Sequence, residues 1–117
     1  MSDAAFAQGD VVDFAQSAER LSGAAVMLDQ ARLNRKEEPG KLAEALETNM
    51  YLWVAIKTIV ERAETDIADA LRQNLIRLAN YVAEATMKGG VDIAESEIDT
   101  LVNINLQVCE GLLEARK

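Results

Sequence analysis

The chain has 117 residues, half of them apolar, so it is long enough for one modest core and too apolar for wholesale disorder. Its formal net charge of −8 disfavours a surface that neutralises phosphates, and we therefore expect no direct binding of nucleic acid. The chain contains no His, and its only Gly pair, Gly89-Gly90, lacks the spacing of a phosphate-binding loop, so we expect no enzymatic activity, no cofactor and no metal site.

Apolar residues at helical spacing, with turn residues between them, predict four helices. The predicted helices run from about Val11 to Leu33, from Lys41 to Arg62, from the region of Thr65 and Asp66 to Met87, and from Ala94 to Ala115. A charged loop with the only Pro separates the first two, and Thr65 or Asp66 is the predicted N-cap of the third. The pair Gly89-Gly90 ends the third helix, as expected of a left-handed C-terminal cap.

These elements predict the all-α class, as a small antiparallel bundle of about four helices. Each predicted helix has roughly 20 residues and a length of about 30 Å at ~1.5 Å per residue. Short connections between helices of matched length favour antiparallel neighbours. We therefore expect a single helical domain over residues 1–117, with residues 1–8 as a mobile tail because they lack an apolar stripe.

The predicted core contains the only Trp and two Asn that lie within apolar stripes. It consists of Asn49, Trp53, Leu71, Leu75, Asn105 and Leu112. Trp53, as the largest apolar side chain, is expected to anchor the packing. A buried amide without partners costs roughly 1–3 kcal/mol, so Asn49 and Asn105 must each find a hydrogen bond. Either they bond to each other or to helix ends, or they bond to the backbone of a bound segment.

The predicted fourth helix is apolar over well over a third of its circumference. Beside the stripe through Leu101 and Leu112 runs a second one, formed by Val102, Leu106, Cys109 and Leu113. This second stripe either faces a groove that accepts a partner helix, or packs on a neighbour because the helix is central. Asn74, at the edge of its own stripe near Tyr81, is a further candidate for external contact. The predicted partner-binding residues are therefore Asn74, Tyr81, Val102, Leu106 and Leu113.

The compartment and the relation to membranes follow from smaller features. The longest apolar run, residues 50–56, is far shorter than the ~20 residues that span a bilayer, so no membrane insertion is expected. Residues 1–10 carry two Asp and no basic residue, unlike a signal peptide, and a lone Cys109 cannot form an internal disulfide. These features favour a cytoplasmic protein.

Three segments carry a family resemblance. They are Asn49-x-x-x-Trp53, Leu71-Arg-Gln-Asn-Leu-Ile76, and the closing Leu101-Val-Asn-Ile-Asn-Leu106 with Gly111-Leu112. Over roughly residues 42 to 113 the chain resembles the FlaF family of bacterial flagellar biosynthesis regulators. The first 30 residues depart from the family because they lack the Pro-Arg-Glu-type run that usually opens it.

The resemblance implies a role in flagellum biogenesis and motility. Members of this family act with FlbT-type regulators to adjust flagellin production post-transcriptionally, and look like helpers of flagellin export. We therefore expect a cytosolic chaperone of flagellin that works by protein–protein contacts, with an FlbT-type regulator and the flagellar export machinery as further partners. The alternatives are direct binding of flagellin messenger RNA, and a purely structural helical adaptor. An RNA-binding protein would need a basic face or stacking aromatics, whereas this chain has five aromatic residues and a charge of −8.

Overall fold

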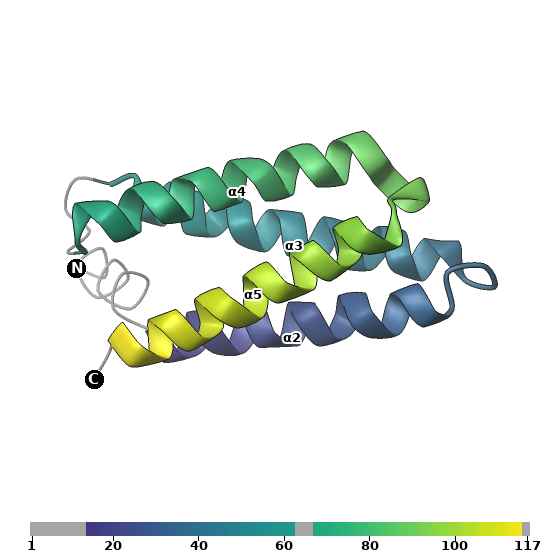
Figure 1. The fold of residues 1–117 in the computed structure, drawn as a ribbon, viewed down its shortest axis with the longest axis horizontal. Coiled ribbons are helices and arrows are strands. Elements are labelled where there is room, and N and C mark those ends of the chain that lie inside the picture. Colours follow the sequence, from purple (N-terminus) through teal and green to yellow (C-terminus); the bar gives the residue numbers. More distant parts are fainter. Residues whose placement is uncertain (1–13, 63–66, 116–117) are drawn as a thin grey trace, which may run out of the picture.

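The computed structural model describes residues 14–62 and 67–115, and within them the fold is an up-and-down bundle of four long helices without strands. The helices are α2 (Phe14–Leu33), α3 (Pro39–Val60), α4 (Asp69–Gly89) and α5 (Glu95–Ala115), with a short 3₁₀ helix η1 (Gly90–Asp92) between α4 and α5. Consecutive long helices run in opposite directions along the bundle (Figure 1). The predicted all-α class and the predicted number of helices are confirmed.

Two helix starts differ from the prediction. Helix α3 begins at Pro39, two residues before the predicted start, because Pro lacks the N–H that the first helical turn leaves unpaired and its φ already fits a helix. Helix α4 begins at Asp69, and its N-cap position is Ala68, which has no side-chain oxygen to offer. The predicted caps Thr65 and Asp66, like residues 1–8 and the predicted start at Val11, lie outside the described residues.

The glycine pair produces a tight reversal between α4 and α5. Gly90 has a φ of 56°, and its N–H donates to the Thr86 carbonyl at the end of α4. A Cβ on Gly89 would lie 2.9 Å from the Cβ of Ile93, which is buried. Arg35, in the turn that follows α2, donates hydrogen bonds of 2.7 Å to each of the carbonyls of Val91 and Ile93. The turn is therefore fixed both by its own glycines and by a side chain from the connection between α2 and α3.

The four helices are not packed equally closely. Among helices that are neighbours in the bundle, α2 lies closely along α5, α3 lies along α4, and α2 also packs on α3, whereas α4 and α5 are packed least closely. The close approach of α2 has a physical cause, since Ala18, Ala24 and Ala25 on its buried side let the backbones come together. Helices α4 and α5 converge at η1 and diverge toward their other ends (Figure 1). Residues of α4 and α5 line two hollows along the line between these helices, and we call the two hollows together the groove.

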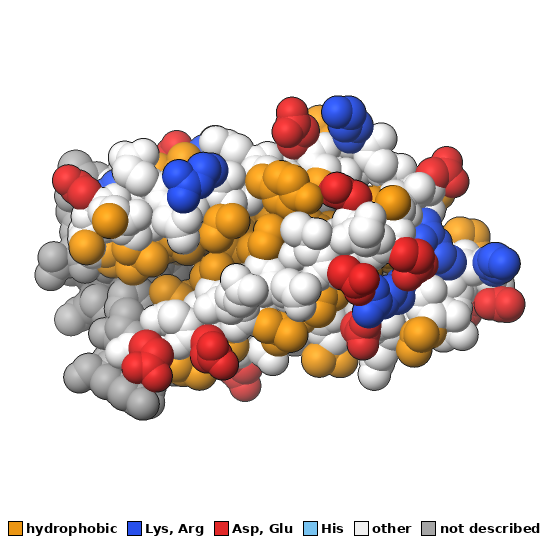
Figure 2. Space-filling view, viewed as in Figure 1, with side chains coloured by type: hydrophobic (Ala, Val, Ile, Leu, Met, Phe, Trp, Pro, Cys, Tyr) orange, Lys and Arg blue, Asp and Glu red, His pale blue; other side chains and the backbone are white. Residues whose placement is uncertain are grey.

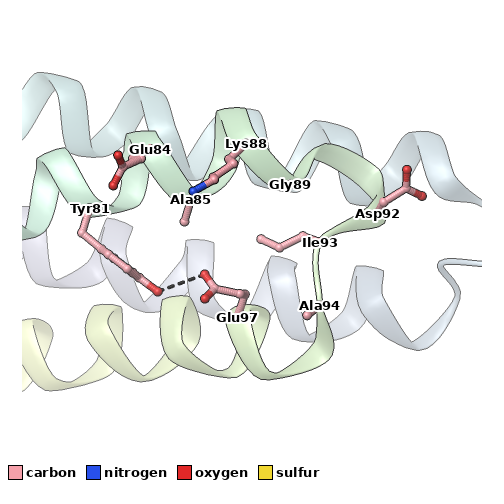
Figure 3. A pocket seen from close by; sticks show the side chains of 9 residues that line it. All are labelled: Tyr81, Glu84, Ala85, Lys88, Gly89, Asp92, Ile93, Ala94 and Glu97. Carbon is pink, nitrogen blue, oxygen red and sulfur yellow. Dashed lines mark hydrogen bonds between the residues drawn. The ribbon is translucent and has the colours of Figure 1, made fainter.

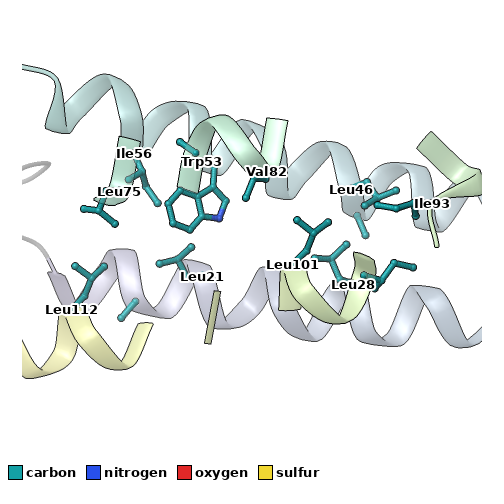
Figure 4. Close-up of a cluster of buried hydrophobic side chains, with 14 of the residues drawn as sticks. Leu21, Leu28, Leu46, Trp53, Ile56, Leu75, Val82, Ile93, Leu101 and Leu112 are labelled. Carbon is teal, nitrogen blue, oxygen red and sulfur yellow. The ribbon is translucent and has the colours of Figure 1, made fainter. Parts of the chain in front are cut away.

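The core lies between the α2/α5 pair and the α3/α4 pair. Its fully buried members include Trp53 and Leu46 of α3, Leu21 and Leu28 of α2, and Leu101 of α5 (Figure 4). The side chain of Leu71 is half-buried against this core, and those of Leu75 and Leu112 are buried in it. Every helix thus contributes apolar side chains to one continuous cluster.

Candidate functional site

A buried hydrogen-bond network fixes the position of α5. Asn105 of α5 accepts a hydrogen bond from the Trp53 indole N–H at 2.9 Å, and its amide donates to Asn49 Oδ1 at 2.7 Å and to the Leu21 carbonyl at 3.1 Å. All three side chains are 0% exposed. Of the two uses considered for Asn49 and Asn105, the structure contains the one in which they bond to each other. The network ties α5 to both α2 and α3.

Helix α4 is attached by different contacts. Lys57 of α3 donates to Asn80 of α4 at 2.8 Å, and Arg72 of α4 donates to the carbonyls of Val60 and Arg62 near the end of α3. These contacts lie on the side of α4 that faces α3. The opposite side of α4 faces the groove, and α5 forms the other wall of this groove.

The wider part of the groove is an apolar hollow of about 440 Å³. Leu71, Leu75 and Leu78 of α4 line one side, and Ile104, Val108 and Leu112 of α5 line the other, with Asn74, Gln107 and Gly111 among them. None of these residues carries a charge. Figure 2 shows hydrophobic side chains gathered along the line between the two helices. We call this part the apolar hollow.

Nearer to η1, the same groove holds a second space of about 390 Å³, which we call the charged hollow. Glu84, Lys88, Asp92 and Glu97 line it, together with Tyr81, Ala85 and the residues of the turn (Figure 3). The Tyr81 hydroxyl donates to Glu97 Oε1 at 3.0 Å and so bridges α4 and α5. Burial raises the pKa of Tyr81, and the hydrogen bond to the Glu97 carboxylate raises this pKa further.

Comparison with known proteins identifies the family. A family model described as flagellar protein FlaF matches residues 13–112, which is most of the chain. The chain belongs to the FlaF family. No curated protein and no solved structure matches it. The matched region of this FlaF protein includes all of α2, so it extends well before residue 42, the start of the resemblance that the sequence motifs indicate.

The FlaF family is a flagellar protein family, and the resemblance inferred from the sequence is therefore confirmed. Within the described ranges 14–62 and 67–115, no helix combines the length and the hydropathy needed to cross a membrane.

The five predicted partner-binding residues of this FlaF protein do not share one surface. Asn74 lines the apolar hollow and Tyr81 lines the charged hollow. Successive helical residues turn by ~100°, so Val102, Leu106 and Leu113 lie on roughly the opposite side of α5 from the groove residues. Val102 is half-buried against the core, whereas Leu106 and Leu113 are 45% and 40% exposed. Their role in binding stays a prediction.

The sequence-based assignment missed the residues of α5 that form the groove, chiefly Ile104 and Gln107. A signal for them exists in the sequence. Leu71 and Leu78 of α4, and Ile104 and Gly111 of α5, are each seven residues apart and lie at one edge of their stripes. Such edge positions indicate which flank of a helix is only partly covered.

Proposed function

We propose that this FlaF protein is a cytosolic chaperone of flagellin that holds one amphipathic helix of flagellin in the apolar hollow between α4 and α5. By the same proposal, it adjusts flagellin synthesis through protein–protein contacts, with an FlbT-type regulator and the export machinery as further partners. The observation that supports this proposal is an uncharged, apolar hollow between α4 and α5, the neighbouring helices that are packed least closely.

The dimensions of the hollow suit a short helix. From Leu71 to Leu78 the α4 side extends over about two helical turns, or roughly 10 Å. An amphipathic helix presents apolar residues at positions i, i+3 or i+4, and i+7, which cover the same length. Leu71, Leu78, Ile104 and Val108 are only half-buried in the free protein, so a docked helix would remove further apolar surface from water.

The charge distribution favours a protein partner over RNA. Helix α5, which forms one side of the groove, contains five acidic residues and no Lys or Arg. Phosphates that entered the groove would therefore meet an acidic helix. A strongly acidic carrier also remains soluble while it holds an aggregation-prone apolar segment.

The test compares two sides of the same helix. In Ile104→Asp a charge enters the apolar hollow, and in the matched control Leu106→Asp the same charge lies on the other side of α5. After circular dichroism has shown that both variants are folded, each is passed with purified flagellin over a sizing column in moderate and in high salt. We expect the wild type and Leu106→Asp to co-elute with flagellin at both salt concentrations, and Ile104→Asp to elute alone.

The other outcomes are equally informative. Loss of the complex in Leu106→Asp but not in Ile104→Asp would move the binding surface to the stripe of Val102, Leu106 and Leu113. If wild-type protein does not co-elute with flagellin at either salt concentration, the proposed chaperone function is wrong.

A further inference from the structure

We propose that the groove selects a helix with two parts: an apolar face that occupies the apolar hollow, followed by a Lys or Arg that pairs with Glu97 in the charged hollow. This inference rests on the proposed function, because it specifies the chemistry of the helix that the groove accepts. Two observations support it: the arrangement of the two hollows along α4 and α5, and the negative charge of the charged hollow.

The two hollows follow one another along the same pair of helices. On α4, Leu78 lines the apolar hollow and Tyr81, one turn further on, lines the charged hollow. On α5, Ile104 lines the apolar hollow, and Glu97, two turns away, lines the charged hollow. A single straight helix laid between α4 and α5 would therefore meet both hollows in succession.

The charged hollow carries net negative charge. Three carboxylates, those of Glu84, Asp92 and Glu97, line it with a single ammonium group, that of Lys88. The residues that line the apolar hollow carry no charge. A partner helix that complements both hollows is therefore apolar along its first turns and cationic beyond them.

Glu97 is the carboxylate best placed to receive the cation. Its position on α5 is across the groove from Tyr81, whose hydroxyl donates to Oε1 at 3.0 Å. This hydrogen bond orients the carboxylate and leaves Oε2 to accept from an incoming Lys or Arg. The groove therefore contains an anion in a defined position immediately beyond its apolar part (Figure 3).

The same carboxylate discriminates against a helix that is apolar throughout. Such a helix would cover Glu97 and remove water from it without supplying a cation, and an uncompensated charge is costly to desolvate. Specificity would then come from two effects together, attraction of a basic residue and exclusion of an apolar one.

A double-mutant cycle tests the pairing. The probes are two designed amphipathic peptides with the same apolar stripe, one with Lys and the other with Gln at the position one turn beyond the last apolar residue. Binding of each labelled peptide to the full chain is measured by fluorescence anisotropy, beside the co-elution with flagellin. We expect the Lys peptide to bind about 2- to 5-fold more tightly than the Gln peptide, as is typical of a partly exposed ion pair.

The protein variants assign that difference to one residue. In Glu97→Gln the advantage of the Lys peptide is expected to disappear, whereas in Glu47→Gln, which removes the same charge from an exposed site on α3, it is expected to persist. Tyr81→Phe is expected to keep the advantage, because the carboxylate and the aromatic ring remain. If the hydroxyl of Tyr81 were itself the contact, Tyr81→Phe would abolish the advantage, and the assignment to Glu97 would be wrong.

Failure of this inference is separable from failure of the proposed function. If both peptides and flagellin bind but the Lys and Gln peptides bind equally, the two-part selection is refuted while helix binding stands. If neither the peptides nor flagellin bind, the proposed function is refuted and this inference with it.

Discussion

The substitution Asn105→Ala tests whether the buried amide network holds the bundle together. The Asn105 side chain makes three hydrogen bonds, one each with Trp53, Asn49 and the Leu21 carbonyl. Because these partners belong to α2 and α3, the substitution removes the buried polar link between α5 and these two helices. We expect this single substitution to lower the free energy of unfolding by a large amount.

The magnitude follows from the groups left without partners. Truncation leaves the Trp53 indole N–H and the Asn49 Oδ1 atom buried, and each buried polar group without a hydrogen bond costs about 1–3 kcal/mol. The Leu21 carbonyl loses less, because a helix carbonyl has a backbone partner as well. We expect the free energy of unfolding to fall by about 3–5 kcal/mol, a large part of the ~5–15 kcal/mol typical of a domain.

The single Trp provides the assay, because it lies inside the network. Urea unfolding is followed by Trp53 fluorescence and by circular dichroism, and the two probes should give the same midpoint for a two-state domain. Asn103→Ala is the matched control, since Asn103 lies on the same helix and is exposed, and its effect should stay within about 0.5 kcal/mol. If Asn105→Ala costs less than about 1 kcal/mol, the buried network is not what fixes the position of α5.

Three further predictions concern other parts of the bundle. Trp53→Ala should cost on the order of 3–5 kcal/mol, and a variant with unchanged thermal unfolding by circular dichroism would contradict its position as core anchor. Gly90→Ala should destabilise by about 1–2 kcal/mol because φ is 56° there, whereas Gly23→Ala, in the interior of α2 with no atom near its missing Cβ, should stabilise by about 0.5–1 kcal/mol. Equal effects in urea unfolding at the two glycines would refute the backbone argument. The pKa of Tyr81 is raised in the folded protein, so the free energy of unfolding should fall as pH rises from about 10 through the folded-state pKa. In urea titrations over the same alkaline range, the free energy of unfolding of Tyr81→Phe should fall less.

The periodicity of the sequence was sufficient for the class, the number of helices and much of the core. Apolar residues every three or four positions define which side of a helix is buried, whatever the neighbour is. Asn49 and Asn105 stood out for the same reason, since an amide within an apolar stripe must find a partner. The start of α3 was placed late because Pro39 and Gly40 are common both in loops and in the first turn of a helix.

The groove could not be located from periodicity, because periodicity does not say which neighbour covers which flank. The stripe of α5 is wide on both sides of Asn105, toward Val102 and toward Ile104. The structure places α2 closely along α5, and the flank lined by Ile104 forms the groove with α4. That choice depends on the three-dimensional order of the helices, which involves contacts between residues more than 50 positions apart, such as Asn105 with Asn49.

The small side chains of α2 explain why the groove lies beside α4. An Ala-rich helix buries little area per residue, but its small side chains allow a close approach between backbones. Close contact with α2 brings the Leu21 carbonyl within reach of Asn105, and the ion pair of Arg32 with Asp99 links the same two helices nearer to the turn. With α5 held against α2 and α3 in this way, its packing on α4 is sparse, and the Tyr81–Glu97 hydrogen bond links the two helices near the turn. The same residues that close the core on one side of α5 therefore leave the apolar hollow on the other, which is the site proposed above for a partner helix.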